Sequence, residues 1–456
     1  MTDPTGMAYA VAKPGSDAGT VASERTFFGH PAGLSVLFLT ETWAHFSYFG
    51  MQALLVYYMT LQLDFSQPNA SALYGGYAAF AYLTPLLGGW LADRTLGQKR
   101  AVVLGGTLMA LGHFSLAFEA LFFPGLFLVG LGNGFFITST TTQVGQLYRE
   151  GDPRRDRAYT VYYVGINIGA FLAPLVCGTL GEFYGWHYGF AAAGVGMLIG
   201  LTIYLSFQRL LGPEPEVQRR PDGGGRKPIG PEGWQRLRTL FAVAALVVLF
   251  RIAYEQSGNT IALWALDNTD RSMGGFVIPA TWFQSINPLL IFTLTPFLAV
   301  WWSRQARQGR EPATLRKMAI GCGLGGLAFV VMIGAGFDYM ETGSASWLWL
   351  LAFFCLLTAG ELFILPIGLS LFGQLSPVQT ASAMIGVWYL AKFAGALLAG
   401  WLGTFWLVLS PPVFFTIGAT AAFTAAAAML AAERFLPRMA RGTTPTAGSA
   451  TLASDS

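Results

Sequence analysis

Six ionisable side chains stand inside long apolar stretches of this chain, and they are the first indication of its chemistry: Glu41, His45, Arg251, Glu255, Glu361 and Lys392. Ionisable groups at membrane depth cost free energy, so they usually face a wet cavity or a partner of opposite charge. An unperturbed imidazole titrates at roughly pH 6.5, within reach of physiological proton exchange. These side chains therefore predict a polar pathway through an apolar protein.

The spacing of four of these groups predicts two pairs. Glu41 and His45 are four residues apart, and so are Arg251 and Glu255. Residues at this spacing lie on one face of a helix, a turn apart. We interpret the Arg251–Glu255 pair as an intrahelical ion pair that serves the structure, and the Glu41–His45 pair as part of the polar pathway.

Lys392 has several interpretations. It follows Trp388 by four residues, so both side chains lie on the same helix face. If Trp388 lines a cavity, Lys392 supplies it with a positive charge or pairs with Glu361 or Glu255. The alternative is that its ammonium extends to the membrane interface, although Lys392 lies deep in its apolar run.

The composition indicates a polytopic membrane protein. The chain has 456 residues, of which 54% are hydrophobic and only 11% are charged. Twelve apolar runs have about the length needed to span a bilayer. They lie at 33–61, 71–92, 100–118, 121–148, 157–183, 187–210, 237–266, 277–302, 314–336, 346–373, 380–408 and 411–436.

Basic residues predict the orientation of these spans. Of the 27 Lys and Arg residues, 24 fall in the tails and in alternate loops, whereas Arg271 stands alone in the opposite loops. Because cytoplasmic loops are enriched in Lys and Arg, we expect a multi-pass protein of the cell membrane with both termini in the cytoplasm. No apolar segment precedes the first span, so we expect no cleaved signal peptide. The net charge of +3 reflects the loop bias and does not suggest nucleic-acid binding.

A segment rich in Gly, Pro and Arg divides the spans into six and six. We expect a cytoplasmic tail at 1–30, a six-helix bundle at 31–210, a cytoplasmic linker at 211–236, a second six-helix bundle at 237–436 and a cytoplasmic tail at 437–456. Two such bundles around a central cavity are the major facilitator arrangement. The predicted fold class is therefore an all-α membrane protein with a major facilitator fold and twelve transmembrane helices.

The segment GGWLADRTLGQKR at 88–100 joins the second and third predicted spans. It resembles the major facilitator loop signature Gly-x-x-x-Asp-Arg-x-x-Gly-x-Lys/Arg-Lys/Arg. Its glycines permit close helix approach, and Asp93 suits the positive N-terminus of a neighbouring helix. The resemblance implies that Asp93 and Arg94 belong to a latch on the inner gate; an ordinary basic cytoplasmic loop is the alternative.

A longer resemblance, to the proton-dependent oligopeptide transporter (POT) family, covers about 30 to 436. Its most specific motifs are GNGFF at 132–136, GQLYREGDPRRD at 145–156, GINIGAF at 165–171 and GWHYGF at 185–190. The first span, TETWAHFSYFGM at 40–51, is similar to the family's Glu-x-x-Glu-Arg-Phe-x-Tyr-Tyr-Gly. The C-terminal half adds YEQSGNT at 254–260, WFQSINP at 282–288 and GELFILPIGLS at 360–370.

The chain departs from the family at several charged positions of its N-terminal half. The second Glu and the Arg of the first-span motif are Ala44 and His45, a following Arg is Gln52, and a Lys of the fourth span is Ile137. In the family these three cations form a positive wall that takes up the substrate carboxylate and participates in proton coupling. The resemblance therefore implies a peptide site whose usual positive wall is uncharged at neutral pH.

The resemblance also implies roles for individual residues. The substrate site is expected to be lined by Tyr48, Gln52, Tyr77, Tyr82, Asn167, Asn287, Glu361, Trp388 and Lys392, with Glu361 binding the substrate's amino terminus. Proton coupling is expected from Glu41, His45 and Glu255. Two alternatives remain open on the residues alone: a helix–helix hydrogen bond for Asn167, and a buried structural role for Glu361.

The function implied is secondary active transport of di- and tripeptides or peptide-like small molecules by alternating access, coupled to protons. One alternative is a facilitator or exporter of atypical peptide-like compounds with weak or altered proton coupling. Another, of a different class, is a non-transporting receptor that reuses the fold. We find no motif of an enzyme and expect no cofactor and no metal. The expected partners are the peptide-like substrate, protons and the lipid bilayer, without nucleic acid.

Overall fold

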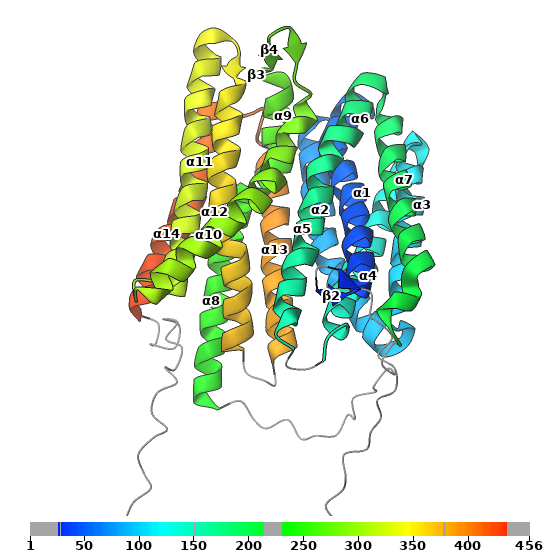
Figure 1. The fold of residues 1–456 in the computed structure, drawn as a ribbon. Coiled ribbons are helices and arrows are strands. Elements are labelled where there is room, and N and C mark those ends of the chain that lie inside the picture. Colours follow the sequence, from blue (N-terminus) through cyan, green and yellow to red (C-terminus); the bar gives the residue numbers. More distant parts are fainter. Residues whose placement is uncertain (1–25, 28, 150–151, 214–229, 377–379, 436–456) are drawn as a thin grey trace, which may run out of the picture.

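The structure, a computed structural model, describes residues 26–27, 29–149, 152–213, 230–376 and 380–435. They form two groups of helices that stand side by side (Figure 1). The N-bundle contains α1 (Gly33–Leu61), α2 (Gln67–Leu91), α3 (Gln98–Leu116), α4 (Phe122–Gln146), α5 (Arg154–Ala173), α6 (Thr179–Tyr184) and α7 (Trp186–Phe207). The C-bundle contains α8 (Pro231–Tyr254), α9 (Thr260–Asp267), α10 (Ile286–Arg307), α11 (Thr314–Thr342), α12 (Trp347–Leu375), α13 (Ala381–Gly403) and α14 (Pro411–Phe435).

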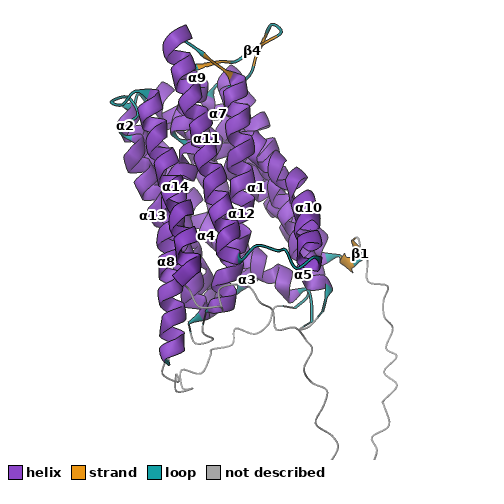
Figure 2. Ribbon diagram, turned by 90° about the vertical axis from the view of Figure 1, so that its left-hand side faces the viewer, coloured by secondary structure: helices purple, strands orange, loops and turns teal. Residues whose placement is uncertain are grey.

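Short elements join or interrupt these helices (Figure 2). There are π-helical turns at Ala92–Leu96 and Pro174–Gly178, and 3-10 turns at Glu119–Leu121, Gln208–Leu211, Glu255–Gly258 and Ala280–Ser285. Two-residue strands pair in the connections: β1 (Thr26–Phe27) with β2 (His30–Pro31), β4 (Ser272–Met273) with β5 (Phe276–Val277), and β3 (Thr269–Asp270) with β6 (Ala345–Ser346). The body of the described chain is therefore helical.

Nine helical segments among the described residues are long and apolar enough to cross a membrane. Two of them run through a short break, from Arg154 to Tyr184 and from Pro231 to Asp267. The helices α1, α2 and α3 fall outside that set but have 29, 25 and 19 residues, which brings the long segments described to twelve. The predicted all-α membrane fold is confirmed. The linker predicted at 211–236 falls mostly on residues 214–229, which lie outside the described residues, and its bounds stay a prediction.

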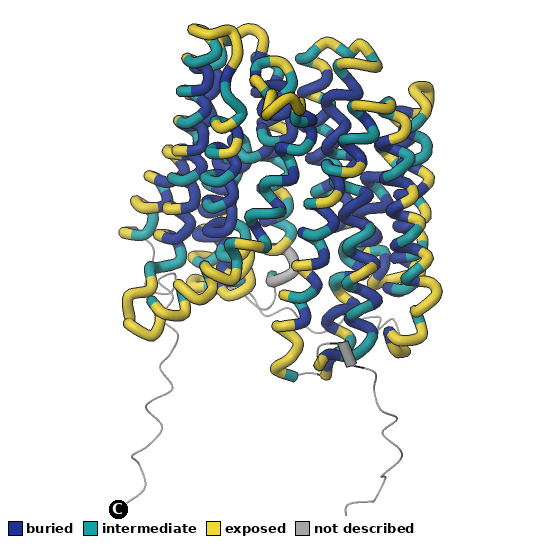
Figure 3. Tube along the Cα trace, turned by 45° about the horizontal axis from the view of Figure 1, so that its top comes forward, coloured by how far each residue is buried: buried dark blue, intermediate teal, exposed yellow. Residues whose placement is uncertain are grey.

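The two bundles meet along α2 and α13. A Cβ atom added at Gly75 would lie 2.4 Å from the Cα of Gly400, closer than any real side chain can approach. Glycines at both positions therefore let the two backbones touch, as small residues do between membrane helices. Buried residues run along the sides of the helices that face one another (Figure 3).

Hydrogen bonds between the bundles cluster at the end that carries the α1–α2 turn, which we call the clamped end. The hydroxyl of Tyr57 donates to the carbonyl of Ala262 (2.9 Å), and that of Ser71 donates to Oδ1 of Asn259 (2.8 Å). The carboxylate of Glu182 accepts from the backbone N–H groups of Ala280 (3.0 Å) and Thr281 (2.8 Å), and Trp282 Nε1 donates to the hydroxyl of Thr179 (2.9 Å).

Toward the opposite end, the described part of α10 is largely exposed. In α10 the buried residues are Pro288 and Ile291, and no later residue of that helix is buried. Phe297, in the same stretch, is 74% exposed. Among the described residues, the hydrogen bonds given above therefore join the bundles at the clamped end, and α10 becomes more exposed toward the opposite end.

Candidate functional site

A cavity of about 360 Å³ lies between the two bundles. Its polar lining from the N-bundle consists of His45, Tyr48, Gln52, Tyr74, Tyr82, Asn133, Tyr163 and Asn167. Its polar lining from the C-bundle consists of Arg251, Tyr254, Glu255, Ser257, Gln284, Asn287, Glu361, Tyr389 and Lys392. The volume suits a small molecule, and the lining is polar and aromatic, as in sites that orient a ligand through a few well-placed groups.

The charged lining residues are distributed unevenly. Every Asp, Glu, Lys and Arg that lines the cavity in the described chain belongs to the C-bundle, namely Arg251, Glu255, Glu361 and Lys392. The N-bundle contributes phenols, amides and the imidazole of His45. We call these two surfaces the charged face and the neutral face of the cavity.

The ion pair that the sequence spacing predicts is formed on the charged face. The guanidinium of Arg251 donates to the carboxylate of Glu255, four residues later, where α8 ends in a 3-10 turn. The hydroxyl of Tyr82, from α2, donates to Glu255 Oε1 (3.0 Å) and accepts from Arg251 Nη2 (2.5 Å). The guanidinium also lies over the ring of Tyr254, 4.6 Å from its centroid. Arg251 is 1% exposed, so its charge is neutralised by groups that surround it on several sides.

Glu361 opens into the same cavity from α12. It is 6% exposed, and its Oε2 accepts a hydrogen bond of 2.8 Å from the amide nitrogen of Asn287. The same amide nitrogen lies 3.0 Å from the hydroxyl of Thr358. The hydroxyl of Tyr254 is a second hydrogen-bond donor to this carboxylate. The two donors position Glu361, and its oxygens retain acceptor capacity for a ligand.

Lys392 comes from α13. Its ammonium lies 4.6 Å from the ring centroid of Tyr82 and 5.5 Å from that of Tyr389. No ion pair to Lys392 is formed within the residues that the structure describes. The aromatic faces hold the ammonium by cation–π attraction, which is weaker than an ion pair and leaves the charge available.

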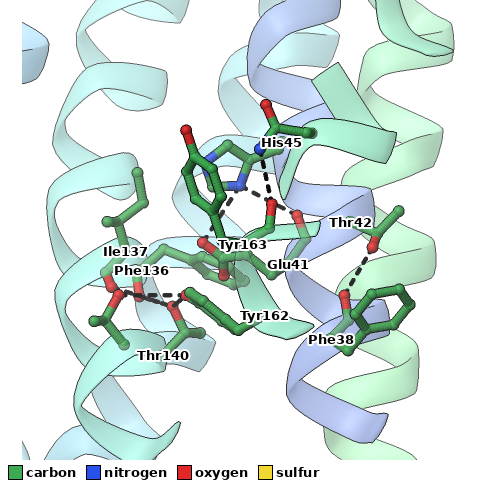
Figure 4. Close-up of polar contacts among 11 residues, drawn as sticks. Phe38, Glu41, Thr42, His45, Phe136, Ile137, Thr140, Tyr162 and Tyr163 are labelled. Atoms are coloured by element: carbon green, nitrogen blue, oxygen red, sulfur yellow. Dashed lines mark hydrogen bonds and ion pairs between the residues drawn. The ribbon is translucent and has the colours of Figure 1, made fainter. Parts of the chain in front are cut away.

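His45 belongs to the neutral face, and its partner Glu41 lies behind that face (Figure 4). Glu41 is fully buried, and its Oε1 lies 3.3 Å from Nδ1 of His45. Tyr162 from α5 and Thr140 from α4 lie beside this pair, with their hydroxyls 3.0 Å apart. His45 lines the cavity whereas Glu41 does not, so the imidazole separates the carboxylate from the cavity.

Asn167 lines the cavity from α5, and its amide donates to the backbone carbonyl of Tyr163 (2.8 Å), one turn earlier. This bond lies within one helix, in contrast to the helix–helix bond that was the alternative. Because the bond uses one of the two amide hydrogens, the oxygen and the second hydrogen of Asn167 remain available to a ligand.

Two residues predicted for the substrate site lie elsewhere. Tyr77 packs between α2 and α4, where its ring is 3.6 Å from a Cβ built at Gly130. Trp388 packs on Phe372, with ring centroids 5.2 Å apart, and over Gly368. Neither contributes to the cavity lining, because each ring is taken up by helix packing within its own bundle.

The loop predicted to act as a gate lies away from the cavity. Oδ1 of Asp93 accepts a hydrogen bond of 2.6 Å from Gln98, the first residue of α3. The guanidinium of Arg94 lies over the ring of Trp90, 5.0 Å from its centroid. Gly97, with φ of +77°, makes the turn into α3, a conformation that side chains other than glycine rarely adopt. Asp93 is thus bonded to the side chain of the first residue of α3, and the gating role of Asp93 and Arg94 stays a prediction.

Several lining residues were not singled out from the sequence. Tyr163, Gln284 and Tyr389 lie three or four residues before Asn167, Asn287 and Lys392, and Asn133 stands in the motif at 132–136. Tyr163, Gln284 and Tyr389 could have been found from the sequence, because residues three or four apart on a helix lie on the same face as the residue already identified.

Comparison with known proteins gives concordant matches. A family model described as the POT family matches residues 99–215 and 231–412. The peptide transporter YePEPT of Yersinia enterocolitica is 35% identical, over 83% of this chain and 88% of its own length. The di-/tripeptide transporter of Lactococcus lactis subsp. cremoris is 33% identical, over 81% of this chain and 88% of its own.

Solved structures agree with these sequence matches. A crystal structure of a peptide transporter POT in complex with sulfate superposes with a TM-score of 0.84 at 30% identity, covering 92% of this chain and 98% of that one. A POT family transporter in complex with 5-aminolevulinic acid gives a TM-score of 0.82 at 26% identity, covering 91% and 98%. This similarity extends over the whole two-bundle body and confirms the major facilitator fold.

Proposed function

The chain belongs to the POT family, and we propose that it is a secondary active transporter of di- and tripeptides or peptide-like small molecules, coupled to protons. The observation that carries this proposal is Glu361, a carboxylate held by Asn287 and open to a cavity between two bundles. A buried carboxylate with free acceptor positions suits a substrate ammonium. The names of the relatives, peptide and di-/tripeptide transporters, support the same substrate class.

Alternating access follows from the contrast between the ends of the molecule. Contacts such as Tyr57 to Ala262 and Glu182 to Thr281 hold the bundles together at the clamped end. The excess of Lys and Arg supports a cytoplasmic location for both termini and for the loops of the opposite end. The clamped end is then extracellular, and the structure corresponds to the state that faces the cytoplasm. Asp93 and Arg94 lie at the cytoplasmic end of α2, where a gate must close in the other state.

Three groups are suited to carry the proton. His45 lines the cavity and covers Glu41, so it can pass protons between cavity water and that carboxylate. Glu255 lies across the cavity, where Tyr82 links it to the opposite bundle. Protonation of Glu255 weakens this link, which joins the two halves that must move.

Uptake into proteoliposomes tests the proposal. Labelled dialanine should accumulate under an inward proton gradient, and an ionophore that collapses the gradient should stop accumulation. Glu361→Gln should abolish uptake, whereas Arg316→Gln, which removes an exposed cation paired with Glu433, should not change it.

Uptake that persists without the gradient would favour the alternative of a facilitator or exporter with weak or altered coupling, which the replacement of cations by Gln52 and Ile137 supports. Binding of dialanine without flux would favour the receptor.

A further inference from the structure

The cavity contains four charged side chains, and two of them neutralise each other. Arg251 and Glu255 form an ion pair within α8, and the hydroxyl of Tyr82 bonds to both. Both partners of that pair are at least 94% buried. Each charge is therefore neutralised by the other, and neither is available to bind a charged ligand group. One acid and one base, Glu361 and Lys392, are left without an ion-pair partner among the described residues.

Each of these two charged groups is held by uncharged neighbours. Glu361 accepts from Asn287, and the ammonium of Lys392 lies on the rings of Tyr82 and Tyr389. A carboxylate and an ammonium at membrane depth without counter-ions are costly to maintain. A ligand that brings one charge of each sign removes both costs at once.

Within the described cavity lining, the neutral face contributes no Lys or Arg. Gln52 is uncharged and uses one amide hydrogen in a hydrogen bond of 3.0 Å to the hydroxyl of Tyr74. His45 is paired with Glu41, and the aliphatic side chain of Ile137 lines the same wall.

We propose that Lys392 binds the carboxylate of the substrate while Glu361 binds its amine, so that the C-bundle alone holds both ends of a zwitterion. The proposal rests on the function proposed above and specifies its substrate: a molecule that carries a free ammonium and a free carboxylate. Lys392 then determines specificity, and substrates without the carboxylate bind less tightly. The two binding groups lie on α12 and α13 of one bundle, so their spacing sets the length of substrate that fits.

The role of Lys392 is tested by comparing ligands that carry or lack each terminal charge, in the wild-type protein and in variants of Lys392. Binding of dialanine, dialanine amide and N-acetyl-dialanine to the purified full-length protein is measured by calorimetry. Loss of one charge-assisted contact should weaken binding to the wild type by about 10- to 100-fold for either derivative. In Lys392→Gln, dialanine and dialanine amide should bind equally to within about threefold, because the group that distinguishes them is gone. The weaker binding of N-acetyl-dialanine should persist in that variant.

Two further variants keep the test decisive. Lys392→Arg retains the charge and should retain the preference for the free carboxylate. Lys392→Met, a second uncharged variant, replaces Lys392→Gln if the latter does not yield a monodisperse protein. Arg316→Gln serves as the matched loss of a cation outside the cavity and should bind all three ligands as the wild type does.

The outcomes separate the inference from the proposed function. A full preference for dialanine over its amide in the uncharged variants would overturn the role of Lys392 and leave peptide transport intact. A wild-type protein that binds dialanine but does not distinguish it from the amide would overturn the zwitterion inference alone. A wild-type protein that binds no peptide would contradict the proposed function, and the inference with it.

Discussion

The charged face and the neutral face of the cavity differ in the side chains that they present. The N-bundle presents phenols, amides and one imidazole, whereas the C-bundle presents both acids and both fixed cations. In alternating access the bundles move as units against each other, so groups on one bundle keep their mutual distances while groups on opposite bundles do not. Charges gathered on one wall can therefore hold a zwitterion throughout the cycle. The neutral wall is free to move past the substrate without breaking an ion pair.

The largest effect is expected on stability, from substitutions in the Arg251–Glu255 ion pair of the charged face. Arg251→Gln leaves Glu255 buried without its ion-pair partner, and removing one partner of a buried pair costs about 3–5 kcal/mol. The thermal midpoint of the purified variant should fall accordingly. Arg251→Gln combined with Glu255→Gln should recover most of the loss, because neither position of the former pair then carries a charge. A double variant as unstable as the single one would mean that Arg251 acts through packing and not through its charge.

A smaller effect, on dialanine binding, is expected from substitutions of Tyr82, the neutral-face residue that contacts Lys392, Glu255 and Arg251. Tyr82→Leu removes the ring on which Lys392 lies and should weaken dialanine binding by about 5- to 30-fold, the range of a desolvated cation–π contact. Tyr82→Phe keeps the ring and loses only the hydroxyl that bonds Glu255 and Arg251. It should bind dialanine more tightly than Tyr82→Leu does. Equal binding by the two variants would show that the hydroxyl, and not the ring, positions the lysine.

The sequence predicts the helices well because each transmembrane helix corresponds to a run of apolar residues that can be recognised directly. The run at 33–61 coincides with α1, Gly33–Leu61. The prediction at 277–302 ends before the helix does, because α10 continues through polar residues to Arg307, beyond the apolar signal. Likewise α8 begins at Pro231, six residues before its apolar run. Hydropathy records where a helix meets lipid and not where its backbone ends.

The site is predicted less completely, and Lys392 and Trp388 show why. They share a helix face by their spacing, yet Lys392 lines the cavity and Trp388 packs on Phe372. A separation of four residues is a rise of about 6 Å, enough to pass from a cavity into the packed zone beside it. Sequence spacing gives the direction of a side chain but not its depth, and depth is decided by how α12 and α13 pack.

A structure of this protein bound to dialanine tests most directly whether one bundle holds both ends of the substrate. We expect the ligand ammonium at the carboxylate of Glu361 and the ligand carboxylate within hydrogen-bonding distance of Nζ of Lys392. A ligand carboxylate placed instead against His45 or Gln52, on the opposite wall, would contradict it.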